Sequence, residues 1–308
     1  MHSAPTEDRQ ALDFIVIGAQ KSGTTSLHHY LKGHPELRLP LSKEAPFFDR
    51  PQDGGSLERF VAEHFGDAPG CRGKVTPHYM MGGPGNDVAR IAERISLVLP
   101  RVRLVALLRD PVERAHSHYR MSVRRQLERR SFEQAVRELL EPEALREGRE
   151  AATETNSYLA AGEYGRILSC YLEQFSREQL LVLPTATLEA RPEEAVREVL
   201  LHVGVDASYR PANLGKRYFQ GGTRERLPRW ASRPLFAGLR ALLPLSGSRS
   251  RSLRTSLYYW FEHWNTAPEE QKPVLTPRTR SALEAHFARD AEVLTPILGA
   301  TPPWITRP

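Results

Sequence analysis

Three segments of the chain contain a continuous apolar run, and each predicts a buried strand. They are DFIVIG at residues 13–18, RVRLVALLRD at 101–110 and QLLVL at 179–183. Because their apolar positions are continuous rather than alternating, both faces of each strand are expected to be covered, as in a parallel sheet.

Between and after these runs, apolar residues recur at helical spacing. Four such segments are residues 24–33, 111–129, 162–175 and 192–204. The first is expected to close at Gly33, with Pro35 just beyond it, and the last at Gly204. Strands that alternate with helices predict an α/β protein with a doubly wound, mostly parallel sheet flanked by helices.

The helix predicted over 111–129 has a distinct start and a distinct inner face. Asp110 is a capping residue type, and Pro111 suits the first helical position. The apolar face is expected to carry Val112, Ala115, Tyr119 and Val123.

Length and composition allow one large α/β domain or two small ones, because the chain has 308 residues and 40% hydrophobic content. The sequence has no internal repeat and no clear domain boundary. We therefore expect one domain over residues 1–308, with a less typical basic and aromatic insertion at about 222–270.

Cysteine content and the chain's N-terminus favour a soluble cytoplasmic protein. The two cysteines, Cys71 and Cys170, predict no disulfide framework, which suits a reducing compartment. Residues 1–13 are polar and acidic and have no signal-peptide core. No apolar stretch reaches the roughly 18 residues that a membrane-spanning helix requires.

Charge is moderately positive overall and strongly positive in one segment. A net charge of +6 and a pI near 9.4 suit anionic ligands but do not by themselves indicate nucleic acid, and we expect no nucleic-acid partner. Residues 217–254 contain nine arginines and a single acidic residue, Glu225, and are followed by an aromatic group at 258–264. This segment is interpreted either as a substrate-facing or peripheral membrane-contacting surface, or as a solvated helical insertion with core aromatics.

The stretch FIVIGAQKSGTTSLHHYL, residues 14–31, has the layout of a phosphate-binding loop. Backbone N–H groups at a helix N-terminus bind anions, small residues at 22–26 let a phosphate approach, and Lys21 adds a charge. The loop of ATP- and GTP-binding proteins follows G-x-x-x-x-G-K-[ST]. Here Thr24 stands where that lysine belongs, which argues against an ordinary ATP or GTP site. The alternative interpretation is a turn that binds nothing.

The segment GAQKSGTTSLHHYL resembles the 5′-phosphosulfate loop of sulfotransferases that use 3′-phosphoadenosine 5′-phosphosulfate (PAPS), in which the lysine precedes the glycine. The resemblance implies the P-loop-NTPase-like sulfotransferase fold. It also implies that the donor's phosphosulfate is bound by Lys21, Ser22, Gly23, Thr24, Thr25 and Ser26.

The same family has a second anion site for the 3′-phosphate, made by an arginine at a strand end and a serine eight residues later. In LVALLRDPVERAHSHYRM, Arg109 and Ser117 match that spacing. A guanidinium can donate two N–H groups to one phosphate, so the resemblance has a chemical basis.

Residues 34–50, HPELRLPLSKEAPFFDR, resemble the H-P-x-[VIL]-x-x-P-x-x-K-E-x-x-F-F segment of heparan-sulfate-type sulfotransferases and their bacterial relatives. In those relatives the glutamate is the general base, which the resemblance carries to Glu44, with Lys43 and Phe47-Phe48 as its neighbours. Sulfuryl transfer needs a base for the attacking hydroxyl and a positive charge on the leaving phosphate, here Lys21. The alternative is that Glu44 is a surface or helix-capping acid.

Residues 72–80, RGKVTPHYM, resemble the family's G-E-K-[ST]-P-x-Y segment with the lysine displaced by one position to Lys74. One residue on a strand separates the two faces of a sheet, so the group that Lys74 contacts is left open. Cytosolic sulfotransferases of small phenols use a histidine base, and the candidates by type are His78, His116 and His118. None lies in a matching motif, and all three are expected to be surface or helix residues, although His78 belongs to a segment expected to line the cleft.

Two further stretches extend the resemblance. Residues 213–222 faintly resemble the N-x-x-K-G-F-Y stretch before the adenosine-covering loop, through Asn213, Lys216 and an aromatic pair. Residues 275–299, followed by Trp304, resemble the closing helix of bacterial members. The resemblance thus covers most of 14–220 and about 275–304.

The leading hypothesis is a PAPS-dependent sulfotransferase that sulfates a hydroxyl of a carbohydrate, lipid or secondary metabolite and releases adenosine 3′,5′-bisphosphate. No metal is required in it, and the sequence has no zinc-type Cys/His cluster. Two rivals stay open: a P-loop kinase using ATP and Mg²⁺, and a catalytically idle protein that binds a nucleotide or an anionic glycan. The sequence leaves the acceptor and the oligomeric state undetermined.

Overall fold

The structure is a computed structural model that describes residues 10–40, 43–45, 47–49, 56–66, 68–216, 218, 223–225, 266–268 and 274–305. The basic segment 217–254 and the aromatic group at 258–264 lie outside these residues, apart from Tyr218 and 223–225.

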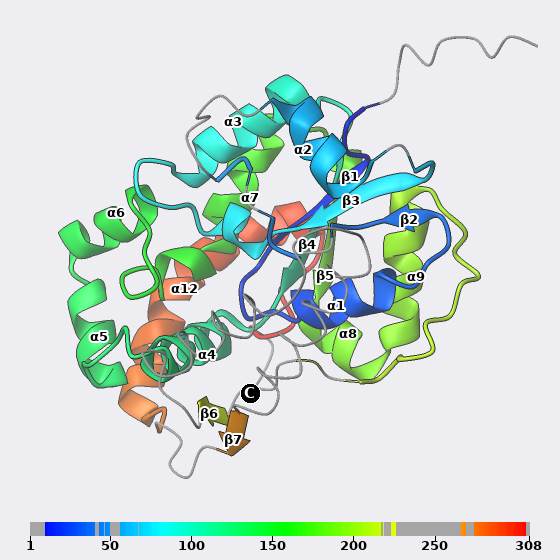
Figure 1. Ribbon diagram of the computed structural model, residues 1–308. Helices are drawn as coiled ribbons and strands as arrows, with labels where there is room; N and C mark the ends of the chain where they lie inside the picture. The colour runs from blue at the N-terminus through cyan, green and yellow to red at the C-terminus, as the bar shows by residue number, and fades with distance from the viewer. Residues whose placement is uncertain are drawn as a thin grey trace, which may run out of the picture.

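A five-stranded parallel sheet forms the centre of the molecule (Figure 1). Its strands are β1 (Phe14–Gly18), β2 (Leu37–Arg38), β3 (Cys71–Val75), β4 (Arg103–Leu108) and β5 (Leu180–Pro184). Their order across the sheet is β2-β3-β1-β4-β5, and every neighbouring pair is parallel. All three strands predicted from apolar runs are confirmed, as is the doubly wound α/β class.

Helices cover both faces of this sheet. One face is covered by α1 (Thr24–Leu31), α8 (Thr185–Ala190) and α9 (Pro192–Val203), and the other by α3 (Val88–Val98), α7 (Tyr164–Leu172) and α12 (Pro277–Leu298). Successive strand residues point to opposite faces. Phe14 and Val16 therefore pack with the first group of helices, and Ile15 and Ile17 with the second.

Beside the sheet, α4 (Pro111–Arg124) leads into two further helices, and its apolar face packs against them and against α12. These helices are α5 (Phe132–Leu139) and α6 (Pro142–Glu150), at the left of Figure 1. The predicted inner face of α4 is confirmed, since Val112, Ala115, Tyr119 and Val123 all belong to this cluster.

The remaining elements in the described residues are short. They are α2 (Leu57–His64), the 3₁₀ turns η1 (Pro77–Met80), η2 (Ala160–Gly162) and η3 (Arg177–Gln179), and an antiparallel pair, β6 (Thr223–Glu225) and β7 (Thr266–Pro268). The turn η1 follows β3 directly at the carboxyl edge of the sheet.

Three helices end before their predicted last residue, and the one predicted over 162–175 ends at Leu172. The helix predicted to close at Gly33 ends at Leu31, with Lys32 as its C-cap in right-handed conformation. Gly33 does not have a left-handed φ, and a Cβ there would meet the Tyr209 hydroxyl. The helix predicted to reach 129 ends at Arg124, and Gln126 beyond it has a left-handed φ of 58°. Asp110 caps that helix as predicted, accepting from the N–H groups of Val112 and Glu113.

Candidate active site

The loop between β1 and α1 has an unusual backbone. Lys21 has a φ of 71° and Gly23 a φ of 88°, so two of three successive residues are left-handed. Such conformations cost little for glycine but are uncommon for a lysine, and they turn backbone N–H groups toward one side. As N-cap of α1, Gly23 has no side chain to pair with the helix's first N–H groups, so these remain suited to an anion.

Contacts from distant parts of the chain hold this loop in place. The Thr185 hydroxyl at the start of α8 donates to the carbonyl of Ser22 at 2.9 Å, and the Ser22 side chain is fully buried. Further along α1, the Ser26 hydroxyl accepts from the N–H of Tyr218 at 3.2 Å. Thr24 is buried and Thr25 is partly exposed. These contacts fix the conformation of the loop at the edge of the sheet.

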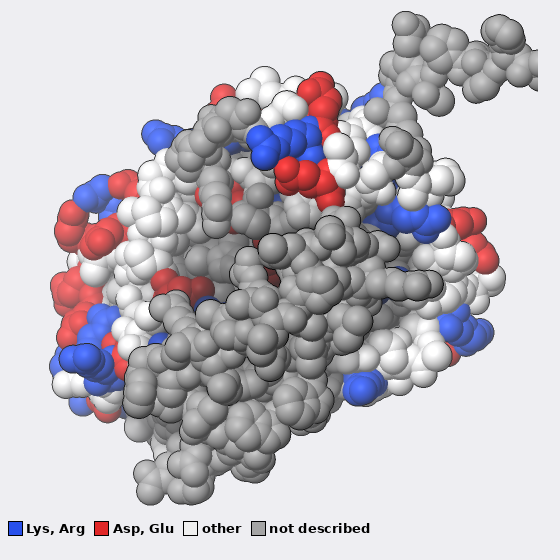
Figure 2. Space-filling model, in the orientation of Figure 1, with Lys and Arg blue, Asp and Glu red and all other residues white. Residues whose placement is uncertain are grey.

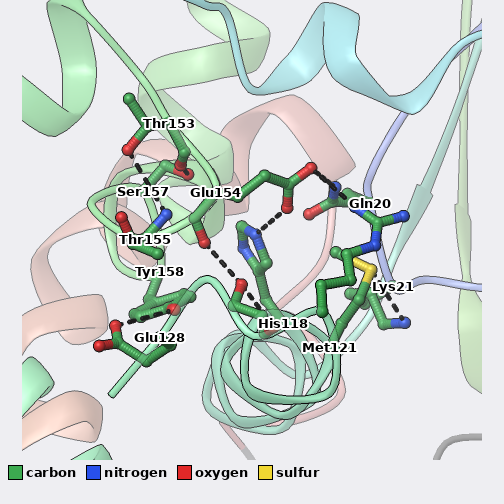
Figure 3. A network of polar contacts seen from close by, with 12 residues as sticks. Gln20, Lys21, His118, Met121, Glu128, Thr153, Glu154, Thr155, Ser157 and Tyr158 are labelled. Carbon is green, nitrogen blue, oxygen red and sulfur yellow. Dashed lines mark hydrogen bonds and ion pairs between the residues drawn. The ribbon is translucent and has the colours of Figure 1, made fainter. Parts of the chain in front are cut away.

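Positive charge is concentrated beside the loop. The Lys21 ammonium lies 3.8 Å from the sulfur of Met121 on α4 (Figure 3). Burial is the largest cause that lowers the pKa of Lys21 to about 7, and three cations act in the same direction: Arg124, Arg125 and Arg109. Glu154 pairs with Arg125 and acts in the opposite direction, but the net shift of the Lys21 pKa is downward, so the site favours an added anion.

Arg109 leaves the end of β4 and returns over the phosphate loop. Its guanidinium lies 3.5 Å from the carbonyl oxygen of Lys21 and 3.9 Å from Glu113, and it is 35% exposed. Ser117 stands on α4 one turn beyond Glu113, on the same helix face. Glu113 is also paired with Arg280 of α12, which offsets its charge. The structure therefore brings Arg109 to the phosphate loop, with Ser117 on the adjoining face of α4.

The segment after α9 packs on the outer side of α1. The ring of Tyr218 stacks on His29, with centroids 3.9 Å apart and planes at 15°. Asn213 donates to the carbonyl of His29 at 3.1 Å and to the Tyr218 hydroxyl at 2.9 Å. The faintly family-like residues 213–218 therefore lie against the helix that begins at the phosphate loop.

Glu44 is 45% exposed and faces two basic side chains. Its carboxylate lies 2.9 Å from the Lys43 ammonium and 3.8 Å from Nδ1 of His78. Burial acts to raise the pKa of Glu44, but the charge and hydrogen bond of Lys43 outweigh it, and the net shift is downward. Arg125, which also acts on Lys21, acts on Glu44 as well, so the two predicted catalytic residues share one neighbourhood.

Glu154 is a central residue of the site that sequence reasoning missed. Its carboxylate faces Gln20 of the phosphate loop at 3.5 Å, Arg125 at 3.1 Å and His118 at 3.0 Å (Figure 3). Burial acts to raise the pKa of Glu154, but hydrogen bonds from His118 and His78, with the charge of Arg125, lower it well below the ordinary range. Residues 151–157 are polar and turn-like, and nothing in their pattern distinguishes Glu154.

His118 is a residue of the helix α4, one of the two placements expected for it, and its side chain is fully buried. The Arg114 guanidinium lies 3.5 Å from its Nδ1, and arginine can only donate. The ring proton therefore sits on Nε2, which donates to Glu154. Burial is the main cause that lowers the pKa of His118 to about 4, so the ring is neutral at pH 7. His116, on the same helix, packs on Phe132 instead.

Lys74, whose contacts the sequence left open, points into the core. Its side chain is fully buried, and its ammonium donates to the Tyr79 hydroxyl at 2.7 Å. It also lies 5.0 Å from the ring centroids of Phe60 and Tyr79. The Tyr79 hydroxyl accepts in addition from the N–H of Phe48, which is fully buried. Lys74 thereby helps to hold the segment that carries Glu44.

The residues of the loop fit a phosphosulfate group. The site offers an ammonium, guanidinium groups and the uncapped N-terminus of α1, all of which are donors. Gly23 has a left-handed backbone conformation, which residues with a side chain rarely adopt. Because glycine has no side chain, an anion can approach the backbone at this point. In the described ranges, no three His, Cys, Asp or Glu side chains are grouped so as to hold a metal ion.

The outer surface has a different character from this site. On the face seen in Figure 2, acidic and basic side chains of the described residues are interspersed rather than gathered by sign. Among the helices the structure describes, none combines the length and apolarity needed to cross a membrane.

A parallel α/β sheet with a phosphate-type loop at its carboxyl edge defines a class of nucleotide-binding protein. Within that class, the profile of the family described as "Sulfotransferase domain" matches residues 12–219. The chain belongs to the sulfotransferase domain family. A crystal structure of a sulfotransferase from Alicyclobacillus acidocaldarius has the same fold, with a TM-score of 0.66 and 22% identity over 97% of this chain and 99% of that one.

Two curated relatives illustrate the sequence similarity. The membrane-associated sulfotransferase kil1 of Dictyostelium discoideum is 36% identical over 116 residues, which are 36% of this chain and 23% of that protein. The mouse heparan sulfate glucosamine 3-O-sulfotransferase 3B1 is 28% identical over 200 residues, 64% of this chain and 47% of the relative. The matched part is therefore less than half of either relative.

Proposed function

We propose that this protein transfers a sulfuryl group from PAPS to a hydroxyl of an acceptor, with Glu44 as general base. The observation that carries the proposal is the neighbourhood that Glu44 shares with the phosphate loop. Glu44 contacts His78, His78 contacts Glu154, and Glu154 contacts Gln20, the residue before Lys21. A binding module has no need of a carboxylate base at this place.

The donor's phosphosulfate supplies an activated sulfur when it is bound at the loop. The acceptor oxygen attacks that sulfur, and its proton passes to Glu44, whose lowered pKa keeps it ionised and able to accept at neutral pH. The bond between sulfur and the phosphate oxygen breaks, and its electron pair stays on the phosphate. Lys21 and the N-terminus of α1 neutralise the charge that develops there.

We assign the 3′-phosphate to Arg109 and Ser117, and the 5′ end to residues 21–26. Arg109 supports a second phosphate contact because its guanidinium stands at the end of β4 beside the loop, where it adds donors to those of residues 21–26. A nucleotide bearing phosphates at both 3′ and 5′ would use both sites, whereas ATP has no group for the second.

For the acceptor we propose a hydroxyl of a carbohydrate, lipid or secondary metabolite. The mouse relative is a heparan sulfate glucosamine 3-O-sulfotransferase, which makes saccharides the first acceptors to screen. The name of the Dictyostelium relative makes membrane-bound acceptors the second.

Calorimetry with adenosine 3′,5′-bisphosphate, ATP and adenosine 5′-phosphate tests the donor site. Micromolar binding of the bisphosphate, with weaker binding of the other two, is the expected result. Binding of ATP with Mg²⁺ and no preference for a 3′-phosphate would instead indicate a kinase.

Transfer from labelled PAPS to the acceptor panel then tests the base. Glu44→Gln should keep bisphosphate affinity and lose turnover by about 100-fold or more. The matched control is Glu58→Gln, which changes an exposed glutamate on α2 and should leave both quantities unchanged. Wild-type binding without turnover on any acceptor would indicate a catalytically idle member.

A further inference from the structure

His78 stands between two carboxylates of the site. Its Nδ1 lies 3.8 Å from Oε2 of Glu44, and its Nε2 lies 3.7 Å from Oε1 of Glu154. The ring comes from η1, the 3₁₀ turn that follows β3, whereas the two carboxylates come from separate loops. A neutral imidazole carries one N–H and can serve one carboxylate, but an imidazolium carries two and can serve both. Both carboxylates lie within ion-pair distance of the ring but beyond hydrogen-bond length, so the charged form is the one that attracts both at once.

We propose that His78 is a positioning residue for the Glu44 base: its imidazolium bridges Glu44 and Glu154 and holds the Glu44 carboxylate ionised beside the phosphate loop. This inference rests on the proposed function of Glu44. It assigns to His78 a role different from the histidine base of other sulfotransferases, because the acceptor's proton still goes to the carboxylate.

The two ends of the bridge differ in exposure and in the contacts that the described residues make with them. Glu154 is held by the Nε2–H of buried His118 at 3.0 Å and by Arg125 at 3.1 Å, and it is only 23% exposed. Glu44 is 45% exposed, and its side-chain contacts with the described residues are with Lys43 and His78. An imidazolium between them therefore transmits the fixed position of Glu154 to the freer carboxylate.

The charges around His78 favour its protonation. Burial acts to lower the pKa of His78, but the carboxylates of Glu154 and Glu44, with Asp49 further off, raise it above 6.5. The cations nearby are occupied by the same carboxylates, Lys43 by Glu44 and Arg125 by Glu154. The bridge is thus complete where both carboxylates are ionised and the pH lies below the raised pKa of His78, and it is lost as the pH rises through that pKa.

The first test is a pH titration of the histidine Cε1–H signals by NMR in ¹³C-labelled protein, with His78 assigned from the spectrum of His78→Gln. We expect His78 to titrate above 6.5, and its pKa to fall by about one in both Glu44→Gln and Glu154→Gln. Glu133→Gln, an exposed glutamate on α5, is the control and should leave the titration unchanged. If the pKa of His78 is the same in both variants as in wild type, the proposed bridge is refuted.

The second test is the pH dependence of kcat with labelled PAPS. His78→Gln should lower kcat about tenfold or more, leave the affinity for adenosine 3′,5′-bisphosphate within about twofold, and remove the fall of activity on the alkaline side. His116→Gln, on α4 against Phe132, is the matched histidine control. An unchanged kcat with the alkaline fall retained overturns the proposal. Wild-type protein that does not bind the bisphosphate refutes the donor assignment instead, and the NMR titration still decides the bridge.

Discussion

The carboxylate of Glu154 accepts a hydrogen bond from Nε2 of His118 at 3.0 Å, at the side of the phosphate loop. Because Arg114 occupies the other ring nitrogen, His118 presents its only proton to Glu154. Arg125 binds the second carboxylate oxygen. A carboxylate surrounded in this way is stabilised in its ionised form, and it ties α4 to the loop at 151–157.

Glu154→Gln should destabilise the fold at pH 7 by about 1–3 kcal/mol, since it removes a charged acceptor from donors that stay in place. The pKa of Glu154 is lower in the folded state than in the unfolded state. Its ionised carboxylate therefore contributes fully to the free energy of unfolding above the unfolded-state pKa, and this contribution is lost as the pH falls toward the folded-state pKa. Urea denaturation at pH 7 and pH 4 measures both effects, and the difference between wild type and variant should shrink at pH 4.

A matched control for this change is Glu150→Gln. Glu150 is 56% exposed on α6 and pairs with Arg146 at the surface. Exposed pairs of this kind contribute about 0–1 kcal/mol, so the control should be close to wild type at both pH values. Equal stability of the two variants at pH 7 would contradict the role given to Glu154.

Arg109→Ala should weaken the binding of adenosine 3′,5′-bisphosphate by about 10- to 100-fold and that of adenosine 5′-phosphate by much less, because the lost contacts are charge-assisted hydrogen bonds to the 3′-phosphate. Calorimetry with both nucleotides gives the comparison. Arg59→Ala is the control, since Arg59 is an exposed arginine of α2 paired with Glu63. An equal loss for both nucleotides would place Arg109 at the 5′ end.

The sequence predicted the core of the fold well because the strands are buried on both faces. Continuous apolar runs of this kind have few other interpretations, and the strands at 14–18, 103–108 and 180–184 all follow from them. The strand β2 has only two residues, which is too short for a recognisable pattern. The end of α1 was misplaced because Gly33 signals a left-handed cap in sequence, whereas the folded chain uses it to admit Tyr209.

The site was predictable only where a local motif carries the chemistry. Lys21 and the residues after it lie together in one loop, so their pattern is visible in the sequence. Glu154 was missed, and His118 was named without its partner, because the two are brought together by packing between α4 and a loop 36 residues away. Lys74 differs again, since one position along β3 decides whether a side chain faces the helix α1 or the Tyr79 side of the sheet.

Lys74→Met should flatten the dependence of stability on pH between about 7 and 10. Burial lowers the pKa of Lys74 to about 7, so above that value the folded state has released a proton that the unfolded state still binds. Stability therefore rises with pH across this window, by up to about 1.4 kcal/mol per pH unit for each such group. Denaturation at pH 7, 8 and 9 measures the slope.

Lys21 has a similarly lowered pKa and contributes to the same slope, so the variant should lose only part of it. Lys32→Met is the matched control, because Lys32 is exposed at the end of α1. A slope in Lys74→Met identical to that of wild type would show that Lys74 keeps its charge in the folded protein.

Binding of adenosine 3′,5′-bisphosphate at pH 8 should be accompanied by proton uptake at Lys21. In the free protein the pKa of Lys21 is lowered to about 7, chiefly by burial, so its amine is mostly neutral at pH 8. A phosphate beside it raises that pKa again, and the amine takes a proton from the buffer. Calorimetry in buffers of different ionisation enthalpy measures the uptake, up to about one proton per site.

The matched variant is Lys21→Arg, which keeps a charge that does not titrate. Its binding of the bisphosphate should show a proton uptake that is smaller by the proton of Lys21. Uptake that is equal in wild type and variant would mean that Lys21 is already charged before the ligand binds.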